Sequence, residues 1–220
     1  MRTTTIGDVK VLLPDLEPDD LDATTDLVNG LTEALVEGSA WRGSHLEDAS
    51  IRSSLITGVD LSESTWEAGS LYGCEITRTD FSGATLTGIT IERCAITGSR
   101  FAGTRLTDVC LKDVLFDGCR FDYATLQRVA AAGSVAFTDC TLTNGAWSSC
   151  RLPRTALRSC DLAGLELDSC HLDGADLRGS RLHGLKTALD NLRGVTLGED
   201  QLPDLTQLTV AALNLAVRKD

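Results

Sequence analysis

The residues best suited to chemistry are eight cysteines and three histidines. Thiolates and imidazoles are common metal ligands, and a thiolate can also attack a substrate or form a disulfide. The histidines are His45, His171 and His183, and none of them stands at the short spacing from a cysteine that a zinc ligand pair needs. We therefore expect no metal site, no cofactor and no catalytic residue among them.

A period of five residues explains where the cysteines fall. Every fifth residue from Trp41 to Leu126 is large and apolar, and after a slip of one residue the period resumes at Phe137 and continues to Leu182. The position two residues earlier is mostly small and is never charged. Cys110 falls on an outward place. The other seven cysteines hold this small position: Cys74, Cys94, Cys119, Cys140, Cys150, Cys160 and Cys170.

A period of five fits neither an α-helix nor a plain strand, whose periods are 3.6 and 2. If each unit forms one short side of a coil, its large and small residues both point inward and the other three point outward. The seven cysteines then fill small inward positions as small hydrophobic residues. A disulfide ladder or a metal array is the alternative, but parallel side chains in stacked coils keep their Cβ atoms farther apart than a disulfide favours.

The units GADLR (174–178) and GATLT (83–87) follow the pattern A(D/N)LxX, and CRFDY (119–123) and CEITR (74–78) are looser variants. Over about residues 39–185 the sequence resembles the pentapeptide-repeat family. The resemblance implies an all-β solenoid, a right-handed quadrilateral β-helix with four units per turn and about seven coils.

Four units per turn set a stacking pattern, because residues 20 apart then lie above one another. Phe81, Phe101 and Phe121 should form one aromatic column. Across the slip, VAAAGSV at 129–135, the offset becomes 21, which places Phe116 beside Phe137. We interpret the slip as a bulge of one residue.

The two ends need caps, because a solenoid exposes its core and unpaired edges there. Residues 1–38 are expected to form an acidic, partly helical N-terminal cap containing Leu21, Leu27, Leu31 and Leu35. Residues 186–220 are expected to form a C-terminal cap, with a helix at about 200–217 that Asp200 caps. The family resemblance implies dimerisation through such a helix, whose apolar residues include Leu202, Leu205, Leu208, Val210, Leu213 and Val217.

The net charge of −12 argues against a basic face for nucleic acid or for an anionic membrane. Residues 1–40 hold nine acids and two bases, whereas residues 41–185 hold 18 acids and 14 bases. The start has no apolar stretch of signal-peptide length, and no apolar run approaches the roughly 20 residues of a membrane span. A cytoplasmic protein with reduced thiols is the expectation.

These observations favour a non-enzymatic scaffold that binds a protein partner and forms a homodimer. The alternative, implied by the family resemblance, is a modulator of DNA gyrase or topoisomerase that mimics DNA and protects against topoisomerase poisons such as quinolones. A DNA mimic needs acids spread along the coils. Here arginines such as Arg93, Arg100, Arg105 and Arg120 interrupt them.

Overall fold

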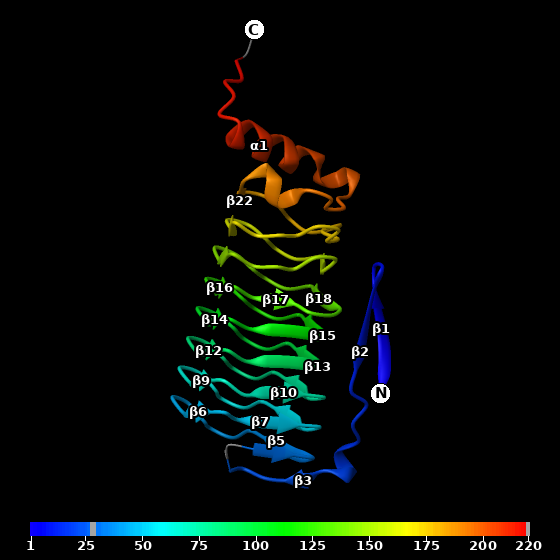
Figure 1. The fold of residues 1–220 in the computed structure, drawn as a ribbon, viewed down its shortest axis with the longest axis vertical. Coiled ribbons are helices and arrows are strands. Elements are labelled where there is room, and N and C mark those ends of the chain that lie inside the picture. The colour runs from blue at the N-terminus through cyan, green and yellow to red at the C-terminus, as the bar shows by residue number, and fades with distance from the viewer. Residues whose placement is uncertain (27–29, 219–220) are drawn as a thin grey trace.

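The structure is a computed structural model that describes residues 1–26 and 30–218, and it shows a tall tower of stacked coils. The chain climbs from β3 at one end to a helix, α1, that lies across the other end (Figure 1). Leu27, expected in the N-terminal cap, lies outside the described residues. The tower has about 8 turns, one more than the resemblance implied. The solenoid fold itself is confirmed.

Each coil has four sides, which we name after four successive inward residues of one coil: Phe101, Leu106, Leu111 and Phe116. The Leu106 side is a parallel sheet of short strands. Its strands are β6 (His45–Glu47), β9 (Thr65–Glu67), β12 (Thr85–Thr87), β14 (Arg105–Thr107), β16 (Thr125–Gln127), β19 (Ala146–Ser148), β21 (Glu166–Asp168) and β22 (Lys186–Thr187).

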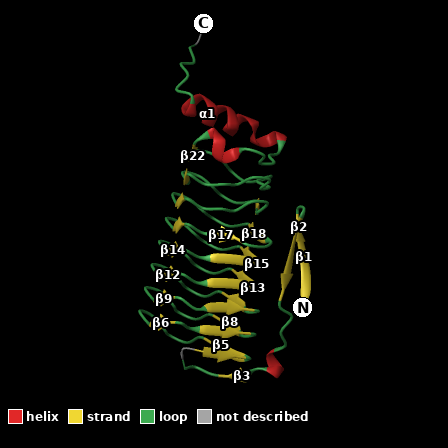
Figure 2. Ribbon diagram, viewed as in Figure 1, coloured by secondary structure: helices red, strands yellow, loops and turns green. Residues whose placement is uncertain are grey.

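A larger sheet covers the Leu111 and Phe116 sides, and two of its strands bend across both (Figure 2). Its strands are β3 (Asp22–Ala23), β4 (Gly30–Thr32), β5 (Ala34–Glu37), β7 (Ser50–Arg52), β8 (Leu55–Thr57), β10 (Ser70–Tyr72), β11 (Glu75–Thr77), β13 (Thr90–Thr97), β15 (Cys110–Asp117), β17 (Ala130–Ala131), β18 (Val135–Thr138) and β20 (Ala156–Arg158). The Phe101 side is joined by single parallel bridges, such as Asp80 to Arg100.

The register between coils is 20 residues, as four units per turn predict. Gly30 already pairs with Ser50, and Asp176 still pairs with Thr196, so the paired coils extend beyond residues 39 and 185 at both ends. Across the slip the register changes to 21. Leu111 lies opposite Ala131, but Val114 lies opposite Val135. The additional residue is therefore accommodated between Ala131 and Val135.

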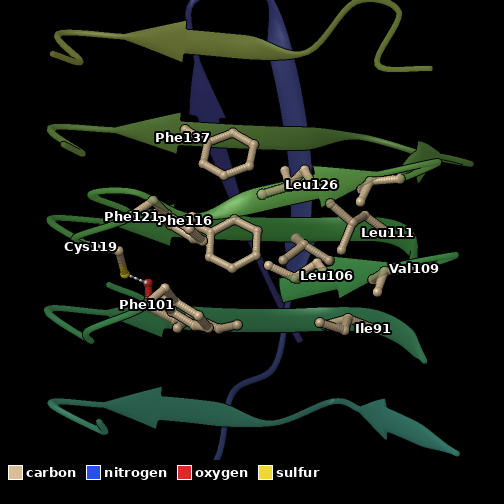
Figure 3. Close-up of a cluster of buried hydrophobic side chains, with 14 of the residues drawn as sticks. Ile91, Phe101, Leu106, Val109, Leu111, Phe116, Cys119, Phe121, Leu126 and Phe137 are labelled. Carbon is tan, nitrogen blue, oxygen red and sulfur yellow. Dashed lines mark hydrogen bonds between the residues drawn. The ribbon is translucent and has the colours of Figure 1, made fainter. Parts of the chain in front are cut away.

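The aromatic side chains stack in two columns inside the tower (Figure 3). Phe81, Phe101 and Phe121 lie face to face, with ring centroids 4.8 and 4.5 Å apart. Phe116 and Phe137 form a second stack at 4.7 Å, and Phe116 meets Phe121 edge-on at 5.3 Å. Stacked and edge-on pairs are the favoured aromatic geometries, so the columns combine burial with specific packing.

The coil turns its corners through residues with a left-handed backbone. Gly103 has φ 66°, and corner residues that are not glycine adopt the same conformation, including Arg93 at 52° and Ala68 at 59°. A side chain in this region costs roughly 1–2 kcal/mol per residue. Glycines such as Gly103 adopt this corner conformation without that cost.

The N-terminal segment forms a β-hairpin where a partly helical cap is expected. Strands β1 (Arg2–Ile6) and β2 (Val9–Leu13) pair with each other and lie along the side of the tower (Figure 1). A short 3₁₀ turn, η1 (Pro18–Asp20), follows before the chain enters the coils. The hairpin packs on the Phe116 side, where Val11 and Leu13 are fully buried against Ala95, Ala136 and Ala156.

At the other end, two 3₁₀ turns, η2 (Leu189–Leu192) and η3 (Glu199–Gln201), lead into α1 (Leu202–Ala212). The helix thus ends before the expected residue 217, because Asn214 adopts a left-handed φ of 49°, which is a common helix stop. Asp200 lies inside η3, and the residue preceding α1 is Gln201.

Candidate functional site

The inward cysteines are buried packing residues in the structure. All eight thiols are free, and the seven inward ones are at most 2% exposed. Their Sγ atoms donate to backbone carbonyls. Cys119 bonds to the Ile96 carbonyl at 3.3 Å, and Cys170 bonds to the Trp147 carbonyl at 3.4 Å. The S–H group of each inward cysteine therefore has a hydrogen-bond acceptor inside the tower.

Neighbouring thiols in a column shift each other's pKa in opposite directions, raising the pKa of Cys140 and Cys150 and lowering that of their partners Cys119 and Cys170. Hydrogen bonding with Cys119 and Cys160, together with burial, raises the pKa of Cys140 far above its usual range. Hydrogen bonding with Cys170, followed by burial, raises the pKa of Cys150 in the same way. Since the thiolate is the reactive form, Cys140 and Cys150 are poor nucleophiles and poor metal ligands as folded.

The histidine side chains are exposed on three different sides of the tower, whereas the seven inward cysteines are buried. His45 is exposed on the Leu106 side, His171 on the Leu111 side and His183 on the Phe101 side. Within residues 1–26 and 30–218, no group of three or more histidine, cysteine or acidic side chains is placed to hold a metal ion. The histidines are therefore not gathered with the cysteines or with one another into one site.

The outward charges pair from one coil to the next. Arg128 makes two hydrogen bonds to Asp108, at 2.6 and 2.7 Å, and these lower the pKa of that carboxyl. The same spacing joins Lys186 to Glu166 at 2.6 Å. Further pairs connect Arg42 to Glu63, Lys112 to Glu92, and Arg181 to Asp161. Several outward acids are consequently paired with a base on a neighbouring coil.

Polar contacts hold the C-terminal cap on the last coil. The Gln201 amide is buried and donates to the carbonyls of Leu177 and Ser180, at 2.8 and 2.6 Å. Asp204 accepts a hydrogen bond from the Leu182 amide at 3.1 Å. Leu208 is 7% exposed and extends the core. Gln201 and Asp204 are not among the residues that the sequence predicts for this cap, which are apolar except for Asp200.

The other apolar residues expected at this end divide into two groups. Leu205 and Val210 are half-buried, whereas Leu202, Leu213 and Val217 are exposed. Leu213 and Val217 lie past the end of α1, in a segment that leads away from the tower (Figure 1). Leu215 on the same segment is 53% exposed. The cap therefore leaves apolar side chains uncovered.

An outward apolar stripe, missed in the sequence, underlies the N-terminal hairpin. Ala95, Leu115, Ala136 and Ala156 occupy the same outward position on successive coils of the Phe116 side. Polar residues are expected there. These four interruptions of the polar pattern were the available signal that something covers this side.

No helix among the described residues has the length and apolar character needed to cross a membrane. A family model for pentapeptide repeats matches the chain in eight copies, over residues 56–93, 74–113 and 149–184. No curated protein matches the sequence.

Two solved structures are similar in fold. Full-length QnrB1, a plasmid-mediated fluoroquinolone resistance protein, is 15% identical with a TM-score of 0.49, and the alignment covers 81% of this chain and 88% of that one. HetL is a pentapeptide repeat protein involved in heterocyst differentiation regulation, from the cyanobacterium Nostoc sp. strain PCC 7120. It is 17% identical with a TM-score of 0.45, over 77% of this chain and 90% of that one.

Proposed function

Because this chain belongs to the pentapeptide-repeat family, we propose that it acts as a non-enzymatic scaffold that binds a protein partner on the sides of its tower. One observation supports this above all: outward side chains stand in fixed register on a continuous buried core that runs from Leu31 to Leu208. A rigid side of this kind presents a preorganised surface, which lowers the entropic cost of binding.

A photoreactive phenylalanine placed on each side in turn tests the proposal. Suitable exposed positions are Arg100, Arg105, Ala132 and Thr97, one for each side of the tower. The full chain should crosslink one protein reproducibly from one side when expressed at its natural level. If no position gives a crosslink above that of an unmodified chain, the scaffold proposal is wrong.

We further propose that the protein is a homodimer joined by α1 and the segment that follows it. Leu202, Leu213 and Val217 are 54%, 55% and 79% exposed, and together they leave an uncovered apolar surface at one end of the molecule. Covering such a surface is favourable by about 25 cal/mol for each Å² removed from water. Pairing of two copies would cover it symmetrically.

The alternative, a DNA-mimicking modulator of gyrase or topoisomerase, draws support from the net charge of −12. The ion pairs between coils favour the scaffold over this alternative, because arginines neutralise the acids that would have to imitate phosphates. A supercoiling assay with purified gyrase, with and without a fluoroquinolone, separates the two. Loss of supercoiling or protection from the drug at micromolar protein would support the alternative, and no effect would remove it.

A further inference from the structure

The bulge interrupts a ladder of hydrogen bonds at one corner of the tower. On the Leu111 side, the amide two residues after the inward residue normally donates to the next coil. Gly73 donates to the Glu92 carbonyl at 2.9 Å, and Arg154 donates to the Asp173 carbonyl at 2.9 Å. Within the described residues, the amide of Gly133 donates no such bond, and the amide of Ser134, which follows it in the bulge, donates no backbone bond either. Two backbone donors are therefore left open at the bulge.

A hollow of about 440 Å³ lies at the same place. Its wall on the tower side consists of Ala131–Ser134 with Pro153 and Arg154, and the hairpin closes it with Asp8, Val9 and Lys10. The residues of the bulge have small side chains, and the Lys112 side chain of the preceding coil lies against Gly133. The hollow is large enough for one or two side chains of another molecule.

Basic groups surround the hollow. Lys10 and Arg154 line it, and Arg151 pairs with Ala130 on the adjoining coil. None of these three bases forms an ion pair with a carboxylate in the described part of the chain. Asp8 also lines the hollow, but it lies 3.7 Å from Arg178, which partly neutralises it.

The Leu111 side of the tower as a whole also carries a net positive charge. Between Ile51 and Leu172 the outward and corner positions of the Leu111 side hold more bases than acids, although the whole chain carries a net charge of −12. The bases are Arg52, Arg93, Lys112, Arg151 and Arg154, and the acids are Glu92, Asp113 and Asp173. An acidic ligand would thus meet an attractive field at this side.

We infer that the bulge hollow is a carboxylate-binding site that docks an acidic segment of the protein partner. Open backbone amides next to lysine and arginine match the oxygens of a carboxylate, and such charge-assisted hydrogen bonds are the stronger kind. The inference rests on the proposed scaffold function, whose binding side and partner chemistry it specifies. A long nucleic acid is disfavoured, because the remaining sides of the tower carry net negative charge.

Binding of a fluorescein-labelled hexaglutamate peptide to the full chain, followed by fluorescence anisotropy at low salt, tests the site. Replacing Lys10 and Arg154 together by Glu should weaken binding at least tenfold. The matched control is Arg78→Glu together with Arg105→Glu, which changes the net charge equally, since both arginines are exposed on other sides and outside the ion pairs of the described residues. It should change binding less than twofold. An equal loss in both variants would mean general charge attraction and would overturn the inference.

A second readout reports on the bulge itself. The NMR amide signals of Gly133 and Ser134 should shift on titration with the peptide, because their N–H groups gain an acceptor. Signals that stay fixed while the peptide binds would overturn the site. Displacement of the peptide by inorganic phosphate at an equal concentration, or tighter binding of a six-nucleotide oligothymidine, would also overturn it as a docking site for an acidic protein segment.

The crosslinking experiment separates this inference from the proposed function. A partner captured from Ala132 through an acidic segment supports both. A partner captured only from Arg100, Arg105 or Thr97 leaves the scaffold proposal standing and overturns the carboxylate site.

Discussion

At the scale of single residues, Phe101 shows how the core resists change. Its ring lies between Phe81 and Phe121, at 4.8 and 4.5 Å, and is 3% exposed. Phe101→Asp should abolish cooperative folding of the central coils, because a charge would be buried without a partner. Phe101→Leu keeps an apolar side chain and should cost only about 1–2 kcal/mol. Thermal melts followed by circular dichroism compare them, and equal melting temperatures would contradict the stacking argument.

Two glycines, Gly69 and Gly103, differ in how much room the structure leaves for a side chain. Gly69 has φ 99°, and a Cβ placed there would lie 2.2 Å from the Ala49 carbonyl oxygen. Gly103 occupies an ordinary corner with no atom within 4 Å of its would-be Cβ. We expect Gly69→Ala to destabilise by about 3 kcal/mol or more, through a backbone clash added to conformational strain. Gly103→Ala should cost about 1 kcal/mol. Urea unfolding measures both, and similar losses would disprove the distinction.

Asp176 stabilises the tower in a way that depends on pH. Burial alone would raise the pKa of Asp176, but hydrogen bonds from Arg178 and Arg158 outweigh burial and lower it to about 2. An unfolded aspartate ionises near pH 3.9, so the stabilisation is complete above about pH 4–5 and is lost as the pH falls toward 2. It amounts to about 2 kcal/mol at pH 7.

We therefore expect Asp176→Asn to lower the free energy of unfolding by about 2 kcal/mol at pH 7. The difference in the free energy of unfolding between this variant and the unmodified protein should narrow as the pH falls from 4 to 2. Urea unfolding at several pH values checks this, with Asp173→Asn as a control, since Asp173 is exposed. A gap that stays constant with pH would show that the effect is not electrostatic.

At the scale of elements, the hairpin of β1 and β2 is attached to the coils by side chains. Val11 of β2 is fully buried. Ion pairs lie near the two ends of the hairpin, from Arg2 to Glu75 at 3.2 Å and from Asp8 to Arg178 at 3.7 Å. Val11→Asp should detach the hairpin while the aromatic columns stay folded, because those columns lie inside the coils. Hydrogen exchange should then become fast in residues 9–13 and stay slow in β13 and β15.

The control for this variant is Thr3→Asp, at an exposed position of the same hairpin. It should leave exchange unchanged. Loss of protection throughout the tower on Val11→Asp would mean that the hairpin is required for the coils to fold.

The elements also show how far sequence reasoning reaches. Five-residue periodicity is enough to predict coils with inward large and small residues, whereas the register of 20 and the aromatic columns also need the four units per turn that the family resemblance implies. The hairpin was missed because β2 reads VKVLL, which offers no period that continues into the coils. The sequence signal for the hairpin lies on the coils that it covers, in apolar outward residues such as Leu115. The proposed carboxylate site depends on missing backbone bonds, and these have no sequence signature beyond the slip itself.

At the scale of the whole molecule, the uncovered apolar end predicts the oligomeric state. Light scattering after gel filtration should give twice the chain mass of 23.5 kDa. Leu213→Asp combined with Val217→Asp should give a monomer, because charges would replace the apolar groups that pairing buries. Thr206→Asp, on an exposed polar position of α1, is the control and should remain dimeric. A monomeric unmodified chain would refute dimerisation.

The hairpin has one more consequence, which concerns synthesis on the ribosome. Residues 2–13 leave the exit tunnel before the coils do, but the surface that covers Val11 and Leu13 is built from residues as late as Ala136 and Ala156. At a typical 5–20 residues per second, the hairpin must wait roughly 10–30 s for its docking surface to be made. During that interval its apolar side chains are open to chaperones. The hairpin is thus made before the coils that it packs against, and it docks only after they have been made.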